Sequence, residues 1–364
     1  MAWICEQCSF IWRFPVDKCI KCSAQTKEYA SANHVVKGIT EVLNPSIEHN
    51  EVPYYVLLLE DSNGRMLLRK SFHNFKIGHE IIEGHITKPD LPRIGIVGTG
   101  VTSVGIAQVA LLSGCNVVLR GRSDKSLNKA VDKIEKSLSK RMDVNKLKIM
   151  MSSLKSTTDI SEFSDADIVI ETVTEDLAIK HSVFNELDSV CREHCILATN
   201  TSSLSIDEIA KAVTRPERVI GMHFFNPIPK MRLVEIIYGD KTAQSTIDFA
   251  RKTTDIFNKT PVIVKNSPGF IVNRILMTLL NEAVQVLEEK LATKEDIDRA
   301  IELGLNHPMG PLKLLDLIGI DIFHDIMITL QNYQPDKFRI PRMIKEMKDN
   351  NILGRKTGHG FYFY

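Results

Sequence analysis

The chain has 364 residues, which is long enough for two to four domains with a hydrophobic core in each. Its 46 basic and 45 acidic residues nearly cancel, so no overall charge favours nucleic acid or a membrane as a partner. The longest apolar runs have the length of strands, and the first residues lack the pattern of a secretory signal. We therefore expect a cytoplasmic globular protein.

Residues 1–28 are dominated by two cysteine pairs, Cys5-x-x-Cys8 and Cys19-x-x-Cys22. Four thiolates at this spacing can bind one zinc ion tetrahedrally, and the metal supplies folding energy that so short a segment lacks. The sequence therefore predicts a zinc ribbon with a structural zinc ion. The alternative, free cysteines or a redox pair, would leave the two matched pairs unexplained.

Residues 29–88 are typical of a small OB-like β-barrel, because short strand patterns follow one another with turn residues between them. The predicted strands are 34–42, 54–60, 65–71 and 80–87, with a hairpin turn at 61–64. Such barrels often bind nucleic acid, but residues 1–88 hold ten basic and ten acidic side chains without a basic stripe. Nucleic acid is therefore not the expected partner.

A stiff segment, Pro89-Asp-Leu-Pro92, precedes an α/β pattern over residues 91–266. Strands and helices alternate there, which is typical of a doubly wound Rossmann-type sheet. The predicted strands are 93–97, 116–120, 168–171, 195–199 and 219–222, and the predicted helices are 101–113, 125–141 and 179–191.

Gly98-Thr-Gly100 lies between the first strand and the first helix, where the pyrophosphate of a dinucleotide would bind. The first glycine permits a tight turn, the second lets phosphate approach the backbone, and the helix N-terminus provides amides and positive potential. Ser103 occupies the position of the third glycine of the usual fingerprint, and Gly105 follows two residues later. The segment predicts a nicotinamide dinucleotide site.

The second strand ends in Arg120-Gly121-Arg122-Ser123, without the acidic residue that binds the ribose hydroxyls in NAD-selective sites. Guanidinium groups bind phosphate bidentately, and a serine hydroxyl adds a hydrogen bond. We therefore expect Arg120, Arg122 and Ser123 to favour NADP over NAD. The alternative is a solvated loop whose arginines contact nothing.

His223 follows the strand at 219–222, and Glu235 lies twelve residues later. A carboxylate bound to one imidazole nitrogen fixes the tautomer and stabilises the imidazolium, so the other nitrogen can move a proton near pH 7. Because open α/β sheets bind ligands at the carboxyl ends of their strands, the pair indicates a dehydrogenase that deprotonates a substrate hydroxyl. A packed histidine near a strand end is the alternative.

Residues 267–364 follow as a helical domain, with predicted helices at 271–290, 294–303, 311–332 and 339–350.

Residues 93–364 resemble the 3-hydroxyacyl-CoA dehydrogenase family, which includes the 3-hydroxybutyryl-CoA dehydrogenases. The motifs that carry the resemblance are Gly98-Thr-Gly100 with Gly105-Ile-Ala-Gln108, Glu171-Thr-Val-Thr-Glu175, Asn200-Thr-Ser-Ser-Leu204, His223-Phe-Phe-Asn-Pro227 with Glu235, Ser267-Pro-Gly-Phe-Ile-Val-Asn273, Gly304-Leu-Asn-His-Pro-Met-Gly-Pro-Leu312 and Gly354-Arg-Lys-Thr-Gly358. The resemblance implies reversible interconversion of (3S)-3-hydroxyacyl-CoA and 3-oxoacyl-CoA, in a homodimer formed through the helical domain. Thr102-Ser103 and the missing acidic residue depart from the family pattern, and both concern the choice of cofactor.

The resemblance also implies a role for each site residue. His223 acts as general base and acid, and Glu235 orients it. Ser202 and Asn273 hydrogen-bond the reacting oxygen and the thioester region of the acyl-CoA. Glu175 lies near the nicotinamide, and Lys180 lies near the cofactor or the acyl-CoA. The alternatives are that Ser202 is only a helix N-cap and that Lys180 is a solvated helix residue.

Residues 1–88 resemble the zinc-ribbon/OB-fold proteins of the DUF35 type, which accompany thiolases, through the cysteine pattern and Phe75-Lys-Ile-Gly78. This resemblance implies that the N-terminal part binds acyl-CoA or docks a thiolase. A zinc-stabilised cap that aids solubility or assembly is the alternative. For the whole chain, two other functions stay open: a dehydrogenase of another hydroxyacid, and an acyl-CoA-binding scaffold subunit.

Overall fold

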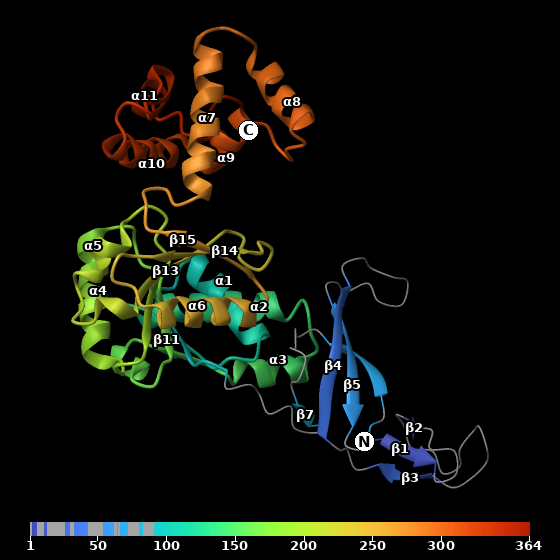
Figure 1. Ribbon diagram of the computed structural model, residues 1–364. Coiled ribbons are helices and arrows are strands. Elements are labelled where there is room, and N and C mark those ends of the chain that lie inside the picture. The colour runs from blue at the N-terminus through green and yellow to red at the C-terminus, as the bar shows by residue number, and fades with distance from the viewer. Residues whose placement is uncertain are drawn as a thin grey trace. The chain divides into compact units, whose positions relative to one another are not determined.

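The computed structural model describes residues 2–5, 11–12, 26–29, 33–42, 54–61, 64, 66–71, 80–82 and 91–364. The chain forms two compact units, Met1–Leu91 and Pro92–Tyr364, and each has its own sheet structure (Figure 1). The division falls between Leu91 and Pro92.

The first unit holds two antiparallel sheets. In the smaller sheet β1 (Ala2–Cys5) lies between β2 (Ile11–Trp12) and β3 (Thr26–Tyr29). The larger has the order β6-β5-β4-β7 and consists of β4 (Asn33–Val42), β5 (Tyr54–Asp61), β6 (Met66–Ser71) and β7 (Glu80–Ile82). Its buried face is formed by Tyr55, Leu57 and Leu59, which alternate along β5, with Val36 of β4. The strands predicted at 34–42, 54–60 and 65–71 are present as β4, β5 and β6, and β7 lies at the start of the one predicted at 80–87.

Most of the predicted zinc site lies outside the described residues. Cys5 ends β1, whereas Cys8, Cys19 and Cys22 lie outside the described residues. Within the ranges given above, no group of histidine, cysteine and acidic side chains could hold a metal ion. The zinc ribbon and the OB-like barrel therefore stay predictions.

The second unit begins with an eight-stranded sheet of order β10-β9-β8-β11-β12-β13-β14-β15. The strands are β8 (Ile94–Val97), β9 (Val117–Arg120), β10 (Leu154–Thr157), β11 (Ile168–Glu171), β12 (Ile196–Thr199), β13 (Val219–Phe224), β14 (Leu233–Tyr238) and β15 (Thr260–Lys265). The six strands β8–β13 are parallel and follow the order of a dinucleotide-binding sheet. β14 is antiparallel to β13 and parallel to β15. The predicted Rossmann-type sheet is confirmed.

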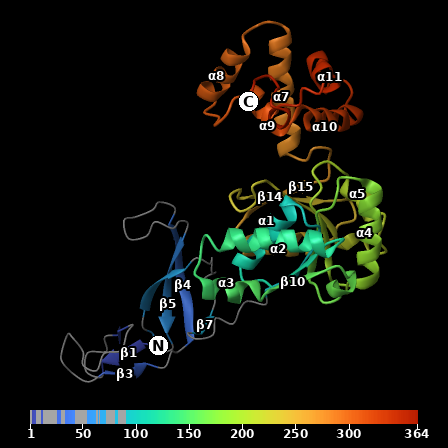
Figure 2. The same ribbon diagram turned by 180° about the vertical axis from the view of Figure 1, so that it is seen from behind.

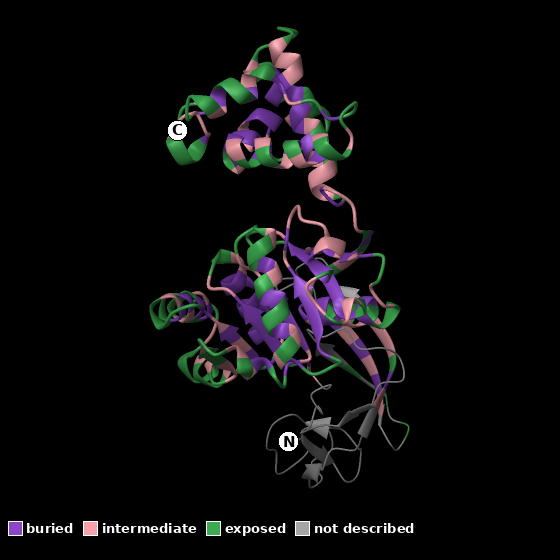
Figure 3. Cartoon of the chain, turned by 90° about the vertical axis from the view of Figure 1, so that its left-hand side faces the viewer, coloured by how far each residue is buried: buried purple, intermediate pink, exposed green. Residues whose placement is uncertain are grey.

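Three of these strands, β10, β14 and β15, are absent from the predicted set. β10 has no buried position, so it lacks the apolar signal of a core strand, and β14 follows a proline-rich segment. By contrast, every residue of β8, β11, β12 and β13 is buried, as expected for parallel strands covered on both faces (Figure 3).

Helices lie on both faces of this sheet (Figures 1 and 2). They are α1 (Val101–Leu112), α2 (Asp124–Leu138), α3 (Val144–Met151), α4 (Leu177–Val190), α5 (Ile206–Ala210) and α6 (Gln244–Ile256). α1, which follows the nucleotide loop, is buried along most of its length. It therefore presents a fixed N-terminus at the carboxyl ends of the strands.

The remaining residues form the predicted helical domain. Its helices are α7 (Val272–Glu288), α8 (Lys294–Gly304), α9 (Pro311–Ile318), α10 (Ile320–Tyr333) and α11 (Arg342–Asp349). The single helix predicted at 311–332 is wrong, because Gly319 adopts φ +106° and separates α9 from α10. None of the helices that the structure describes has the length and hydropathy needed to cross a bilayer.

Candidate active site

His223 and Glu235 are cross-strand partners in the β13–β14 hairpin. Because paired residues of neighbouring strands point to the same face of a sheet, the two side chains lie directly opposite each other. His223 Nδ1 lies 2.8 Å from Glu235 Oε2, and only 8% and 1% of the two side chains are exposed. The structure confirms that the two side chains form a hydrogen-bonded pair.

The second oxygen of Glu235 is held by the start of α7. Oε1 accepts hydrogen bonds of 3.0 Å from the amides of Ile271 and Val272. Burial alone would raise the pKa of Glu235, but the hydrogen bond with His223 and the two amides outweigh burial and lower it. The ionised carboxylate can only accept, so Nδ1 of His223 carries the proton. Nε2 is then the basic nitrogen of the neutral ring, and none of the described residues hydrogen-bonds it.

Aromatic side chains and a clamped loop surround the imidazole. The ring of His223 lies 4.4 Å from that of Phe225 and 5.8 Å from that of Phe270, measured between centroids. Phe225 begins the loop between β13 and β14, and Lys259 fixes this loop by donating to the carbonyls of Ile228 at 2.6 Å and Met231 at 2.8 Å. Burial, with the charges of two nearby arginines, lowers the pKa of Lys259 to about 8. Sequence reasoning missed Lys259, because nothing in its own segment distinguishes it.

Ser202 and Asn273 are brought together although 71 residues separate them. Asn273 Nδ2, on the first turn of α7, donates to the carbonyl of Ser202 at 3.1 Å. Asn200 joins this loop to the dyad strand, because its Oδ1 accepts from the amide of Phe224 at 2.9 Å. Ser202 is not the N-cap of the following helix, since Ser205 caps α5. The alternative reading of Ser202 is therefore wrong.

Glu175 organises the same loop from the other side. Its Oε1 accepts from the hydroxyl of Thr201 at 2.6 Å and from the amides of Ser202 and Ser203 at 2.9 and 3.0 Å. Burial raises the pKa of Glu175, but these donors and the charge of Lys180 together lower it. Glu175 is therefore an ionised acceptor at the edge of the site, with 35% of its side chain exposed.

Lys180 is neither solvated nor open to a ligand in this structure. Only 1% of its side chain is exposed, and Nζ lies 2.8 Å from Glu171. The solvated-helix alternative is wrong. The ammonium group is enclosed between β11 and α4. The expected proximity of Lys180 to the cofactor or acyl-CoA stays a prediction.

The nucleotide loop has the geometry that its glycines predict. Gly98 adopts φ +125°, and a Cβ there would approach Thr172 Oγ1 to 2.6 Å. Gly100 is the N-cap of α1, and a Cβ there would meet nothing within 4 Å, so the space above the helix N-terminus is open. Ser103 is fully buried beneath the loop, where its hydroxyl accepts from the amide of Gly100 at 3.2 Å and pairs with Thr172 at 2.6 Å. Ser103 therefore shapes the loop from inside.

The residues after β9 differ in their freedom to bind a phosphate. Arg120 contacts Glu186 at 3.6 Å and the carbonyl of Thr158 at 3.4 Å, whereas Arg122 is exposed and has no ionic partner among the described residues. Ser123 caps α2 by accepting from the amide of Ser126.

Gly121, between the two arginines, is closely packed. A Cβ at this position would approach Thr99 Cγ2 to 2.7 Å and Leu127 Cγ to 2.8 Å. An acidic side chain therefore does not fit here without movement of its neighbours.

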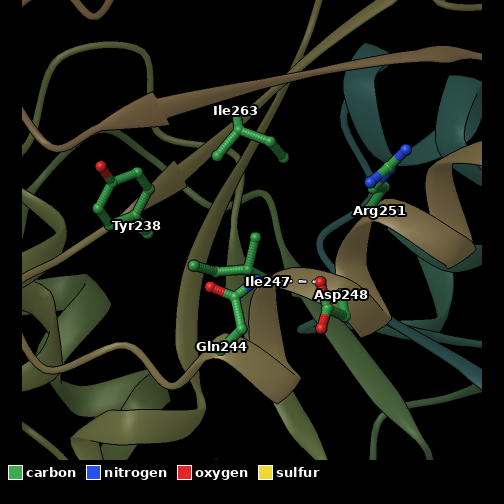
Figure 4. Close-up of a pocket in the computed structure, with 6 residues that line it drawn as sticks. All are labelled: Tyr238, Gln244, Ile247, Asp248, Arg251 and Ile263. Atoms are coloured by element: carbon green, nitrogen blue, oxygen red, sulfur yellow. Dashed lines mark hydrogen bonds between the residues drawn. The ribbon is translucent and has the colours of Figure 1, made fainter.

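A surface hollow lies elsewhere, against α6, β14 and β15 (Figure 4). Along α6, at its edge, Gln244 donates to Asp248 at 3.0 Å. The residues that line the hollow are Tyr238, Gln244, Ile247, Asp248, Arg251 and Ile263. It contains none of the predicted site residues. The candidate site is instead defined by His223 and Glu235 together with the loops at 98–100 and 200–203.

Comparison with known proteins agrees with this geometry. The family model described as 3-hydroxyacyl-CoA dehydrogenase, NAD binding domain, matches residues 93–267, and the one described as 3-hydroxyacyl-CoA dehydrogenase, C-terminal domain, matches residues 269–364. A 3-hydroxybutyryl-CoA dehydrogenase of Clostridioides difficile is 44% identical over 279 residues, which are 75% of this chain and 99% of that protein. The human mitochondrial hydroxyacyl-coenzyme A dehydrogenase is 39% identical over 303 residues, which are 78% of this chain and 92% of that protein. The crystal structure of (S)-3-hydroxybutyryl-CoA dehydrogenase from Ralstonia eutropha matches with a TM-score of 0.74 and 40% identity, covering 76% of this chain and 99% of that one.

Proposed function

Because the chain belongs to the 3-hydroxyacyl-CoA dehydrogenase family, we propose that His223 and Glu235 perform the proton transfer of that family's reaction. The chain is an NAD-dependent dehydrogenase that interconverts 3-hydroxyacyl-CoA and 3-oxoacyl-CoA. The observation that carries the proposal is the buried contact of 2.8 Å between His223 Nδ1 and Glu235 Oε2. It leaves Nε2 as the free basic nitrogen at the carboxyl end of β13.

The residues present fit a nicotinamide dinucleotide. Gly98 permits the turn, Gly100 leaves open space, and the first amides of α1 face that space. When bound, this cofactor supplies the acceptor or donor of the hydride.

The described side chains supply position and a proton. During oxidation Nε2 of His223 takes the proton of the 3-hydroxyl, and the carboxylate of Glu235 stabilises the imidazolium that forms. During reduction the imidazolium returns this proton to the 3-oxo group. Ser202 and Asn273, which contact each other, bind the reacting oxygen and the thioester region and so fix the substrate relative to Nε2.

The test of this function is reduction of acetoacetyl-CoA, followed by the loss of NADH or NADPH absorbance and repeated with longer acyl chains. We expect turnover of CoA thioesters, and (3S)-3-hydroxybutyryl-CoA as the product. Activity on free hydroxyacids but not on CoA thioesters would instead support a dehydrogenase of another hydroxyacid. Binding of acyl-CoA without turnover would support a scaffold subunit.

We propose further that the segment after β9 lets this dehydrogenase use NADP(H) in preference to NAD(H). Because Arg122 is exposed and Gly121 leaves no room for an acidic side chain, the loop can bind the 2′-phosphate of NADP(H) in preference to the bare ribose of NAD(H). Arg120, which already contacts Glu186, and Ser123, which caps α2, have smaller parts in this binding.

Arg122→Ala is expected to raise KM for NADPH about tenfold and to leave KM for NADH within about twofold, because one charge-assisted phosphate contact is lost. Steady-state kinetics with both cofactors measure this. Arg342→Ala, which removes an exposed arginine from α11, is the matched control and should change neither constant. Equal effects on NADPH and NADH in Arg122→Ala would contradict the assignment.

The N-terminal part is proposed to be a zinc-ribbon and OB-fold module that binds acyl-CoA or docks a thiolase. Three observations support this proposal: the spacing of the cysteines, the balanced charge of residues 1–88, and the separation of Met1–Leu91 as a compact unit. Deleting residues 1–88 should remove bound zinc and abolish co-purification with a thiolase, while dehydrogenase activity is retained. Zinc content without any thiolase or acyl-CoA binding would instead support a stabilising cap.

A homodimer formed through the helical domain is proposed as well. Large apolar side chains on this domain, among them Ile275, Leu291 and Leu303, are exposed in the single chain. Sedimentation equilibrium should give twice the mass of the chain, and a monomer at micromolar concentration would contradict the proposal. Among the described residues, the buried cysteines Cys191 and Cys195 form no disulfide, which supports a reducing, cytoplasmic location.

A further inference from the structure

A buried ion pair lies at the end of β11, beside the candidate active site. Lys180 Nζ lies 2.8 and 2.9 Å from the two carboxylate oxygens of Glu171, whose side chain is fully buried. Glu171 also accepts from the amide of Val173 and, at 2.7 Å, from the hydroxyl of Thr199. Each carboxylate oxygen therefore has two donors, which hold the group in one orientation.

Stability alone does not account for this pair. Removing two charges from water is costly, and buried ion pairs can often be replaced by apolar side chains without loss of stability. The location of Glu171 is more informative. In the sheet it pairs with Val97 on one side and Thr199 on the other, at the carboxyl ends of the strands, where α/β sheets bind their ligands.

Lys180 connects this pair to the loop at 201–203. Its Nζ lies 3.5 Å from Oε2 of Glu175, and Oε1 of Glu175 binds the amides of Ser202 and Ser203. The carbonyl of Ser202 in turn accepts from Asn273. A continuous series of contacts therefore runs from Glu171 to the two side chains that are proposed to direct the substrate.

We propose that Glu171 is a positioning residue for the dehydrogenase reaction. It fixes Lys180, and through Lys180 and Glu175 it fixes the loop that carries Ser202. Without the charge of Glu171, Lys180 draws the carboxylate of Glu175 toward itself and away from the loop amides. The inference rests on the proposed roles of Ser202 and Asn273 in placing the substrate.

Glu171→Gln keeps the size of the side chain and removes its charge. We expect kcat for acetoacetyl-CoA reduction to fall about tenfold, because a small displacement of substrate-positioning groups is costly in rate. KM for NADH should rise by a smaller factor than kcat falls, since the nucleotide loop at Gly98 and Gly100 does not contact the pair, although Glu175 is expected near the nicotinamide. The thermal midpoint is measured alongside. A lower midpoint with the kcat of wild type would overturn the proposal.

A second variant set separates positioning from a general loss of stability. Lys180→Met removes the cation, and the double variant Glu171→Gln/Lys180→Met carries neither charge. We expect the double variant to have a kcat above that of Glu171→Gln and about threefold below wild type, because the unpaired buried cation is gone but Glu175 has lost its anchor. If Glu171→Gln does not fold, the double variant decides, and a kcat equal to wild type overturns the proposal.

The control is Glu208→Gln, which breaks an exposed ion pair of 2.7 Å with Lys211 on the same domain. It should leave kcat unchanged, because exposed pairs contribute little. Wild-type protein without activity on acetoacetyl-CoA would defeat the proposed function itself. Active wild type with an unaffected Glu171→Gln would defeat only the role of Glu171.

Discussion

Replacing His223 by alanine is expected to lower kcat for acetoacetyl-CoA reduction by about 10²- to 10⁴-fold, the usual contribution of a positioned acid or base. The physical reason is that alanine has no group that could accept or donate a proton at the position of Nε2. KM for NADPH and NADH should change little, because the nucleotide loop and the segment after β9 do not contact the imidazole. Stopped-flow or steady-state absorbance at the nicotinamide band gives both constants.

The control for this variant is His194→Ala, which removes an exposed histidine before β12. It should have the kcat of wild type. Circular dichroism should show the same fold in both variants, since alanine at 223 leaves space between Phe225 and Phe270 without placing a charge there. A His223→Ala protein with more than a tenth of the wild-type kcat would overturn the assignment of the general base.

Glu235→Gln is expected to lower kcat by a similar factor, about 10²- to 10⁴-fold, for a different reason. The amide oxygen of glutamine can still accept from Ile271 and Val272, so its NH₂ group faces Nδ1 of His223. Nδ1 then becomes an acceptor, and the ring carries its proton on Nε2. This tautomer cannot take the proton of the substrate hydroxyl, so oxidation of 3-hydroxybutyryl-CoA is the direction to measure.

The matched control is Glu135→Gln, which neutralises an exposed glutamate on α2 and should leave the rate unchanged. The pH dependence offers a second check on Glu235. Because the folded-state pKa of this carboxyl is lowered, its contribution to stability is fully present above the unfolded pKa and is lost as pH falls through the folded pKa. Glu235→Gln should therefore be less sensitive to acid than wild type in thermal unfolding. An equal acid sensitivity of the two proteins would contradict this account.

Most of the α/β domain could be predicted from the sequence, because its central strands are mainly apolar and bounded by turn residues. The edge strand β10 could not, since its positions are only partly buried or exposed. Within the helical domain, the break at Gly319 was missed because the apolar pattern continues on both sides of it. Only the backbone conformation at that residue separates the two helices.

The dyad could be predicted from residue type and from its place after a strand, but its geometry could not. The pairing of His223 with Glu235 depends on β14, which was not predicted as a strand. The burial of Lys180 could not be predicted either. Its expected role came from a resemblance, whereas its burial is set by Glu171, an acidic residue that ends an otherwise apolar strand. That contrast of one carboxylate after three apolar residues is the signal that sequence reasoning could have used.

The β13–β14 hairpin also determines which changes the catalytic pair can tolerate. Side chains alternate between the two faces of a sheet, so a slip of one residue in either strand would send His223 or Glu235 to the opposite face. An insertion in the connecting loop at 225–232 need not alter this register, because extra residues can bulge outward. Turnover therefore serves as a measure of strand alignment: a variant that remains active has kept its pairing, whatever the length of the loop.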